Sequence, residues 1–93
     1  MIKEPITDFS KLIEGKEYNI HSEQFNTDNK ARLICFDTTP LNRPISYWQF
    51  TERGYSPVNK KQLKQMFKNN IYPRTVFSLW DKELDKNIIT EID

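Results

Sequence analysis

The sequence predicts an α+β domain, in which one main helix packs on a small twisted antiparallel sheet or on a partly open small barrel. Five short segments are rich in aromatic and β-branched residues, and most of them alternate apolar with polar positions, as strands do. One later segment has its apolar residues at helical spacing. The first three predicted strands follow one another without crossover helices, which favours an antiparallel sheet. The 93 residues are expected to form a single compact domain over 1–93.

A short N-terminal helix is predicted over residues 7–14. Either Thr7 or Asp8 is placed to cap it, and Gly15 follows where a helix end favours positive φ. One apolar stripe is formed by residues at i, i+3 and i+4, namely Phe9, Leu12 and Ile13. Because a helix of two turns is marginal by itself, this one needs tertiary support.

Three strands are predicted next, over residues 17–22, 30–37 and 45–51. Side chains alternate between two faces along a strand, so Tyr18 and Ile20 share the buried face of the first one. The second strand is apolar on both faces, which indicates a central position in the sheet. Its faces are formed by Leu33 with Cys35 and by Ile34 with Phe36. The faces of the third strand are Trp48 with Phe50 and Ile45 with Tyr47.

The main helix is predicted over residues 59–69. Asn59 is a good N-cap, and Gln62 three positions later completes a capping box. The buried stripe is expected to be Leu63, Met66 and Phe67. Two further strands are predicted over residues 75–80 and 88–92. The last one is an edge through which two copies could pair, so a monomer or a homodimer is expected.

The charges are distributed unevenly along the chain, although the net charge is +1. Residues 1–29 carry a net −3, residues 30–74 carry nine bases and two acids for a net +7, and residues 75–93 carry a net −3. Two interpretations are open. Either the two signs neutralise each other in the folded chain, or the basic middle part meets a partner.

The single cysteine, Cys35, has no partner for an internal disulfide, which favours a reducing, cytoplasmic compartment. No apolar run approaches the roughly 18 residues of a membrane span, and the N-terminus lacks the apolar run of a signal peptide. The sequence therefore predicts a protein with no membrane partner.

No catalytic, cofactor or metal site is predicted. Cys35 and His21 are the only residues of their types, and a thiol inside an apolar strand usually acts as a small hydrophobe. Zinc needs closely spaced Cys and His residues. A run of alternating acids could form a magnesium site but is more typical of a solvated surface; it comprises Asp81, Glu83 and Asp85. Two isolated glycines cannot form a phosphate cradle.

The strongest functional pattern is basic. Lys60, Lys64 and Lys68 recur at i, i+4 and i+8, with Lys61 beside them. The predicted binding surface adds Arg43, Arg53, Tyr55 and Arg74. The aromatic residues that interleave with these bases are Tyr47, Trp48, Tyr55 and Tyr72. Lysines on phosphates and aromatic rings on bases are the usual combination for single-stranded nucleic acid, but the solvated side of an amphipathic helix has the same pattern.

Two short stretches, residues 14–18 and 31–35, resemble small-barrel domains in general, which makes an SH3-like barrel a variant of the predicted fold. A short chain with its own start methionine and no catalytic motif also resembles, as a type of gene, the regulators and inhibitors carried by phages and other mobile elements. This resemblance implies a small regulatory or inhibitory protein directed at a nucleic-acid-processing or defence protein.

The function expected from the sequence is therefore non-catalytic binding of a protein partner. Tyr, Trp and Arg dominate interface hot spots, and the loop 38–44 and the turn 53–55 are natural contact points. The alternative is a nucleic-acid-binding module that uses helix 59–69, against which the pI of about 7.8 counts. A small enzyme that uses Cys35 and His21 is a third hypothesis.

Overall fold

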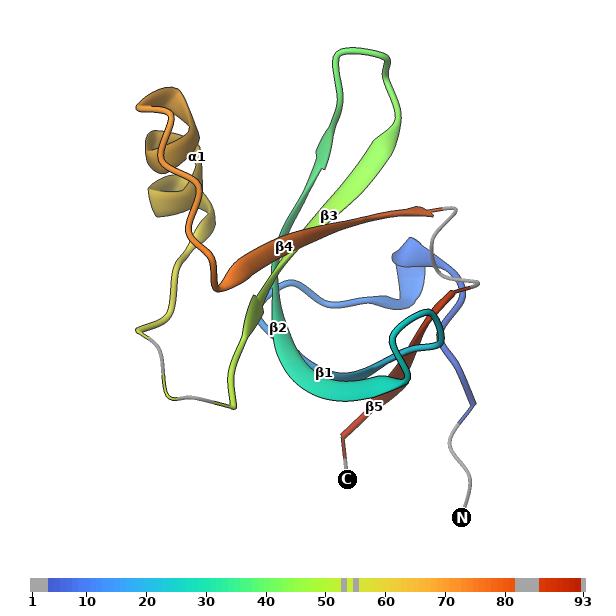
Figure 1. The fold of residues 1–93 in the computed structure, drawn as a ribbon. Coiled ribbons are helices and arrows are strands. Elements are labelled where there is room, and N and C mark those ends of the chain that lie inside the picture. Colours follow the sequence, from blue (N-terminus) through green and yellow to red (C-terminus); the bar gives the residue numbers. More distant parts are fainter. Residues whose placement is uncertain (1–3, 53, 55, 82–85, 93) are drawn as a thin grey trace.

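The computed structural model describes residues 4–52, 54, 56–81 and 86–92, and Figure 1 shows their fold. Five antiparallel strands form one sheet in the order β4-β3-β2-β1-β5. The strands are β1 (Glu17–Ser22), β2 (Thr27–Thr38), β3 (Pro44–Phe50), β4 (Val76–Trp80) and β5 (Asn87–Glu91). The helical elements are a 3-10 turn, η1 (Phe9–Lys11), and α1 (Lys60–Lys68), which stands beside the sheet.

The predicted fold class is wrong. The described chain is mostly β, with one α-helix of nine residues, whereas the sequence predicted an α+β domain with a second, N-terminal helix. The sheet is open rather than closed into an SH3-like barrel, because β4 and β5 lie at opposite ends of the strand order and do not pair with each other. Short connections explain why β1 pairs antiparallel with β2 and β2 with β3. The other two pairs, β3 with β4 and β1 with β5, are also antiparallel, although α1 separates β3 from β4 and most of the chain separates β1 from β5.

The helix predicted over residues 7–14 is replaced by the three-residue turn η1. Asp8 does cap this turn, since its Oδ1 accepts a hydrogen bond from the Ser10 N–H at 3.0 Å. The same hydrogen bond lowers the pKa of the Asp8 carboxyl. Ile13 is exposed rather than part of a buried stripe, so the helical periodicity of this segment does not match its packing.

Hydrogen bonds to the sheet, rather than helical hydrogen bonds, determine the backbone of residues 12–16. Leu12 already has extended backbone angles, and its side chain is buried in the core. The Gly15 N–H donates to the Leu33 carbonyl at 2.6 Å, and the Leu33 N–H donates to the Lys16 carbonyl at 3.0 Å. With these bonds to β2 the chain makes a turn at Glu14 and Gly15 after the extended Leu12, instead of a helix end. A helix of two turns has too few bonds of its own to resist them.

Strand β2 begins earlier than predicted and contains a β-bulge. Leu33 pairs with Trp48 and Cys35 pairs with Tyr47, so Ile34 is an extra residue without a partner of its own. An extra residue shifts the alternation of the side chains by one position. The predicted shared face of Leu33 and Cys35 is therefore wrong: Leu33 joins one core cluster, and Cys35 joins the other together with Ile34.

The two faces of the sheet carry two core clusters. The first is the larger one and comprises Leu12, Tyr18, Ile20, Ala31, Leu33, Trp48, Leu79 and Ile89. The second lies where α1 meets the sheet and comprises Ile34, Cys35 and Leu63, with Tyr47, Val58, Phe67 and Val76 packed against it. Helix α1 therefore packs through the second cluster, on one side of the sheet.

The main helix begins and ends within one residue of the prediction. Asn59 Oδ1 accepts from the Gln62 N–H at 2.8 Å, and Gln62 Oε1 accepts from the Asn59 N–H at 3.0 Å, which confirms the capping box. Leu63 is buried as predicted, whereas Met66 and Phe67 are half-buried. Among the described residues, no helix is long and apolar enough to cross a membrane.

A buried glutamine ties α1 to the sheet. Gln49 on β3 is 2% exposed. Its Nε2 donates to the Ser56 carbonyl at 3.0 Å, and its Oε1 accepts from the Val58 N–H at 2.9 Å. Ser56 and Val58 belong to the segment that leads into α1, so Gln49 fixes the start of the helix against β3.

We expect Gln49→Leu to lower the free energy of unfolding by about 1–3 kcal/mol, because the Val58 N–H and the Ser56 carbonyl lose their part-buried hydrogen bonds. Urea unfolding followed by circular dichroism measures this loss. Gln65→Leu on the exposed side of α1 is the matched control, with an expected change below about 0.5 kcal/mol. Equal stability of the two variants would contradict the anchoring role of Gln49.

Candidate functional site

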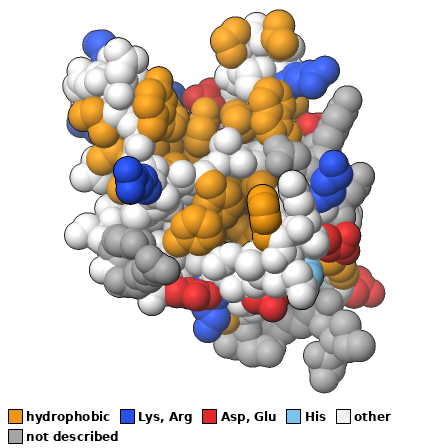
Figure 2. All heavy atoms as spheres, in the orientation of Figure 1, with side chains coloured by type: hydrophobic (Ala, Val, Ile, Leu, Met, Phe, Trp, Pro, Cys, Tyr) orange, Lys and Arg blue, Asp and Glu red, His pale blue; other side chains and the backbone are white. Residues whose placement is uncertain are grey.

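A groove with aromatic walls lies between α1, β4 and the hairpin that joins β2 to β3. We call it the tyrosine groove. Its volume is about 660 Å³, and it is lined by Pro40, Tyr47, Phe67, Tyr72, Pro73, Val76, Phe77 and Ser78. Figure 2 shows hydrophobic side chains gathered between α1 and the hairpin, while the Lys and Arg side chains on this face are scattered singly. A groove of this size and composition is typical of a binding site.

Three aromatic rings of the groove come from three different elements and hold each other in place. Tyr47 on β3 meets Phe67 on α1 edge to face, with ring centroids 5.2 Å apart. Phe67 in turn packs against Tyr72, with centroids 5.5 Å apart and the ring planes tilted by 32°. Burial, aided by the nearby Asp37 carboxylate, raises the pKa of the Tyr47 hydroxyl. The groove wall is therefore a packed aromatic unit.

The chain reversal after α1 brings Tyr72 to the groove. Asn70 has a φ of 57°, in the left-handed region that Asn tolerates better than most residues. The Ile71 N–H then donates back to the Met66 carbonyl at 2.8 Å, as at many helix C-termini. This reversal directs the following residues back along the helix, and Pro73 precludes any further helical turn.

Exposed hydrophobic side chains gather around this groove. Three of the five large hydrophobic residues that are exposed in the described chain are lining residues or their immediate neighbours, namely Leu41, Ile71 and Tyr72. Tyr72 is 69% exposed. The other two, Ile13 and Phe25, do not line the groove. Exposed apolar groups that cluster in this way mark interaction sites more often than scattered ones do.

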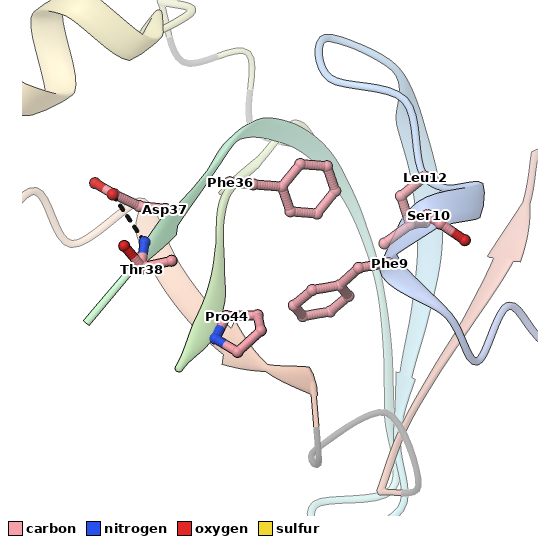
Figure 3. A pocket seen from close by; sticks show the side chains of 7 residues that line it. All are labelled: Phe9, Ser10, Leu12, Phe36, Asp37, Thr38 and Pro44. Carbon is pink, nitrogen blue, oxygen red and sulfur yellow. Dashed lines mark hydrogen bonds between the residues drawn. The ribbon is translucent and has the colours of Figure 1, made fainter. Parts of the chain in front are cut away.

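A second groove of about 560 Å³ lies between η1 and the base of the hairpin (Figure 3). Phe9 and Phe36 face each other across it, with ring centroids 5.4 Å apart. Both rings are half-buried and pack against the first core cluster. The Asp37 carboxylate points away from the rings and accepts from the Thr38 N–H at 2.8 Å. This groove therefore offers core packing rather than exposed anchors, and the tyrosine groove is the stronger candidate.

The structure leaves the predicted basic residues on the surface. The exposed ones are Lys60, Lys61, Lys64 and Lys68 on α1, Arg43 in the hairpin loop and Arg74 just before β4. Among the described residues, the ion pairs are Lys16 with Glu91 at 3.1 Å and His21 with Asp28 at 2.7 Å, if the histidine is protonated. None of these six bases forms an ion pair with a described acid. Direct contact with the described acids of residues 1–29 and 75–93 therefore does not neutralise them.

The sequence predicts two contact points, the hairpin loop 38–44 and the turn 53–55, and the structure describes the first fully and the second only in part. The hairpin loop contributes Pro40 to the tyrosine groove. Of the turn 53–55, Arg53 and Tyr55 lie outside the described residues, and Gly54 has a positive φ of 68°. Tyr72 was predicted only as one of several interleaved aromatic residues, and its signal was its place between a helix end and a proline.

The two nucleophilic candidates lie far apart. His21 pairs across the sheet with Asp28, seven residues before Cys35 on β2, which is about 20 Å at roughly 3.3 Å per residue. Cys35 is 1% exposed, and its burial raises the pKa of the thiol. A thiol of this kind is a poor nucleophile at neutral pH. Within the described ranges, no three His, Cys, Asp or Glu side chains come together as a metal site; Glu83 and Asp85 lie outside those ranges.

Comparison with known protein families, with curated proteins and with solved structures finds no match to this chain.

Proposed function

We propose that this chain is a non-catalytic regulator or inhibitor that acts by binding a protein partner, and that the tyrosine groove is its docking site. The observation that carries the proposal is the position of Tyr72. Tyr72 is 69% exposed, and its ring packs against Phe67 and lines an apolar groove of about 660 Å³. A pre-ordered aromatic ring beside an apolar groove is the usual anchor of a protein interface.

The surroundings of the groove support a protein partner. Leu41 and Ile71, the chain neighbours of the lining residues Pro40 and Tyr72, are exposed aliphatic residues, and aliphatic side chains suit apolar side chains of a protein. The rings of Tyr47 and Phe67 meet edge to face, so they do not form a row of parallel platforms for stacked bases. The groove is therefore better suited to peptide side chains than to a nucleic acid strand.

The experiment that tests this proposal is site-specific photo-crosslinking with p-benzoylphenylalanine in place of Tyr72, in cells that express the chain. The matched control places the same photo-crosslinker at Phe25, which is 71% exposed and does not line the groove. We expect a discrete protein adduct from position 72 that position 25 does not give, and binding of the purified adduct partner to the unmodified chain. Adducts of equal yield at both positions, or a nucleic acid adduct at position 72, would contradict the proposal.

A second candidate function is nucleic-acid binding by α1. The specific observation in its favour is that Lys60, Lys64 and Lys68 are exposed along one side of the helix, without a described acid in contact. The 25 residues from 56 to 80 contain five bases and no Asp or Glu. Phosphate contacts by several lysines give binding that weakens steeply with salt.

The charge-reversal variant Lys60→Glu/Lys64→Glu/Lys68→Glu tests this second candidate. We expect the variant to stay folded, because a Glu in the first turn suits the helix dipole and offsets the loss of Lys68 from the last turn, each effect being about 0.3–1 kcal/mol. Fluorescence anisotropy with single-stranded RNA, single-stranded DNA and duplex DNA over a salt series is the measurement. Salt-dependent binding that the variant loses would support nucleic-acid binding, and equal titrations of both proteins would exclude it.

A further inference from the structure

We infer that the tyrosine groove takes an acidic, extended segment of its protein partner, and that this segment adds as a strand to the outer edge of β4. The inference rests on the proposed function and specifies the partner and the geometry of its binding. Two independent observations carry it: the direction of the backbone hydrogen bonds along β4, and the charges around the groove.

The backbone of β4 presents hydrogen-bonding groups at the edge of the sheet. The Phe50 N–H donates to the Thr75 carbonyl at 3.0 Å, so this is a hydrogen-bonded pair between β3 and the residue before β4. Hydrogen-bonded pairs alternate with non-bonded pairs along an antiparallel ladder. Trp48 with Phe77 is therefore the next bonded pair, and Tyr47 with Ser78 is a non-bonded pair. The N–H and C=O groups of Ser78 consequently point away from β3.

The groove and this edge are continuous. Val76, Phe77 and Ser78 belong to β4 and also line the tyrosine groove. Strand β4 is the last in the strand order, and no described strand pairs with its outer side. A segment that bonds to Ser78 would direct alternate side chains toward Tyr72 and the apolar lining, which is how added strands gain both affinity and specificity.

The charges next to the groove favour an acidic segment. Lys68 directly follows the lining residue Phe67, and Arg74 directly follows Pro73. Both bases are exposed and have no described acid in contact. The acids nearest along the chain are Asp37 and Asp81, three residues from the lining. Of these, Asp37 lies close enough to act on the Tyr47 hydroxyl, so the two exposed bases outnumber this one acid at the groove. Complementary charges of this kind fix the partner and its orientation more than they raise affinity.

A peptide library gives the test. The full chain is panned against phage-displayed random twelve-residue peptides, with the Tyr72→Asp variant as the counter-selection. We expect enriched peptides in which Asp or Glu alternates with aromatic or aliphatic residues. Enrichment of neutral or basic peptides, or no enrichment over the counter-selection, would overturn the inference. Such a failure would not contradict the proposed docking site, which the photo-crosslinking experiment tests separately, because a folded partner surface could still bind the groove.

Strand addition itself is tested at Ser78 with the best enriched peptide. Proline is tolerated at an edge position whose N–H points outward, so Ser78→Pro removes one peptide contact while the pairing with β3 is kept. We expect binding at least about tenfold weaker for Ser78→Pro than for Ser78→Ala, as loss of a main-chain hydrogen bond predicts. Should Ser78→Pro not fold, amide hydrogen exchange of the unmodified chain decides: protection of the Ser78 N–H by the peptide supports strand addition, and unchanged exchange overturns it.

Discussion

Trp48→Ala is expected to lower the free energy of unfolding by about 3–5 kcal/mol, the usual cost of truncating a buried tryptophan. Trp48 is fully buried at the centre of the first core cluster. Its ring meets Tyr18 edge to face at 5.8 Å and stacks with Phe77 at 6.4 Å. A domain of this size has a total stability of roughly 5–14 kcal/mol. The substitution is therefore expected to remove a large share of the total stability.

A hydrogen-bond chain adds to the effect of this substitution. Trp48 Nε1 donates to Ser46 Oγ at 2.8 Å, and Ser46 Oγ donates to the Leu79 carbonyl at 2.9 Å. Both side chains are buried, so these two hydrogen bonds link β3 to β4 out of contact with water. The variant Trp48→Phe keeps an aromatic ring but removes the indole N–H and part of the ring volume, for which we expect a smaller loss of about 1–3 kcal/mol.

Urea unfolding followed by circular dichroism compares the two Trp48 variants with the unmodified chain. The expected order of stability is unmodified chain, Trp48→Phe and Trp48→Ala. A Trp48→Ala variant that unfolds at the same urea concentration as the unmodified chain would contradict the assignment of Trp48 to the centre of the core.

Local signals account for the parts of the fold that the sequence predicts well. The cap of α1 depends on Asn59 and Gln62, which are three residues apart, and the helix lies within one residue of its predicted ends. The strand predicted over 17–22 is β1 with the same limits, and Tyr18 and Ile20 are buried as their alternation predicts. Both elements are determined by residues within the element itself.

Contacts between residues far apart in the sequence account for the errors in the predicted fold. The segment around Leu12 has helical periodicity, but bonds from Gly15 and Lys16 to Leu33 join it to β2, and Leu33 lies about twenty positions from Leu12 in the sequence. The bulge at Ile34 depends on the register between β2 and β3, which no pattern within β2 reveals. Closure of the sheet depends on whether β4 meets β5, and this is a property of the whole chain.

The candidate site was predicted in part. The exposed lysines of α1 were predicted from their helical spacing, whereas the groove beside them was not. Tyr47, Phe67 and Tyr72 come from three elements whose relative positions the sequence does not give. Gln49 and Ser46 were not singled out, because a polar residue in a strand is usually solvent-facing. The assignment to a phage or mobile element stays a prediction.

The largest expected functional effect is that of Tyr72→Asp on partner binding. A central aromatic anchor contributes about 2 kcal/mol or more to an interface, which is roughly thirtyfold or more in affinity. The variant is expected to stay folded, because the side chain is 69% exposed and belongs to neither core cluster. The carboxylate would also place a polar, hydrated group at the mouth of an apolar groove.

Phe25→Asp is the matched control, since Phe25 is 71% exposed and lies in the turn between β1 and β2, outside the groove. Its substitution removes a similar exposed ring and introduces the same charge. The two variants therefore differ only in whether the altered side chain borders the tyrosine groove.

The measurement that tests the central claim most directly is the affinity of both variants for the purified photo-crosslinked partner, by isothermal titration calorimetry. If the tyrosine groove is the docking site, Tyr72→Asp binds roughly thirtyfold or more weakly than the unmodified chain, and Phe25→Asp binds as well as the unmodified chain. If Tyr72→Asp keeps full affinity, or if both variants lose it equally, the groove is not the docking site.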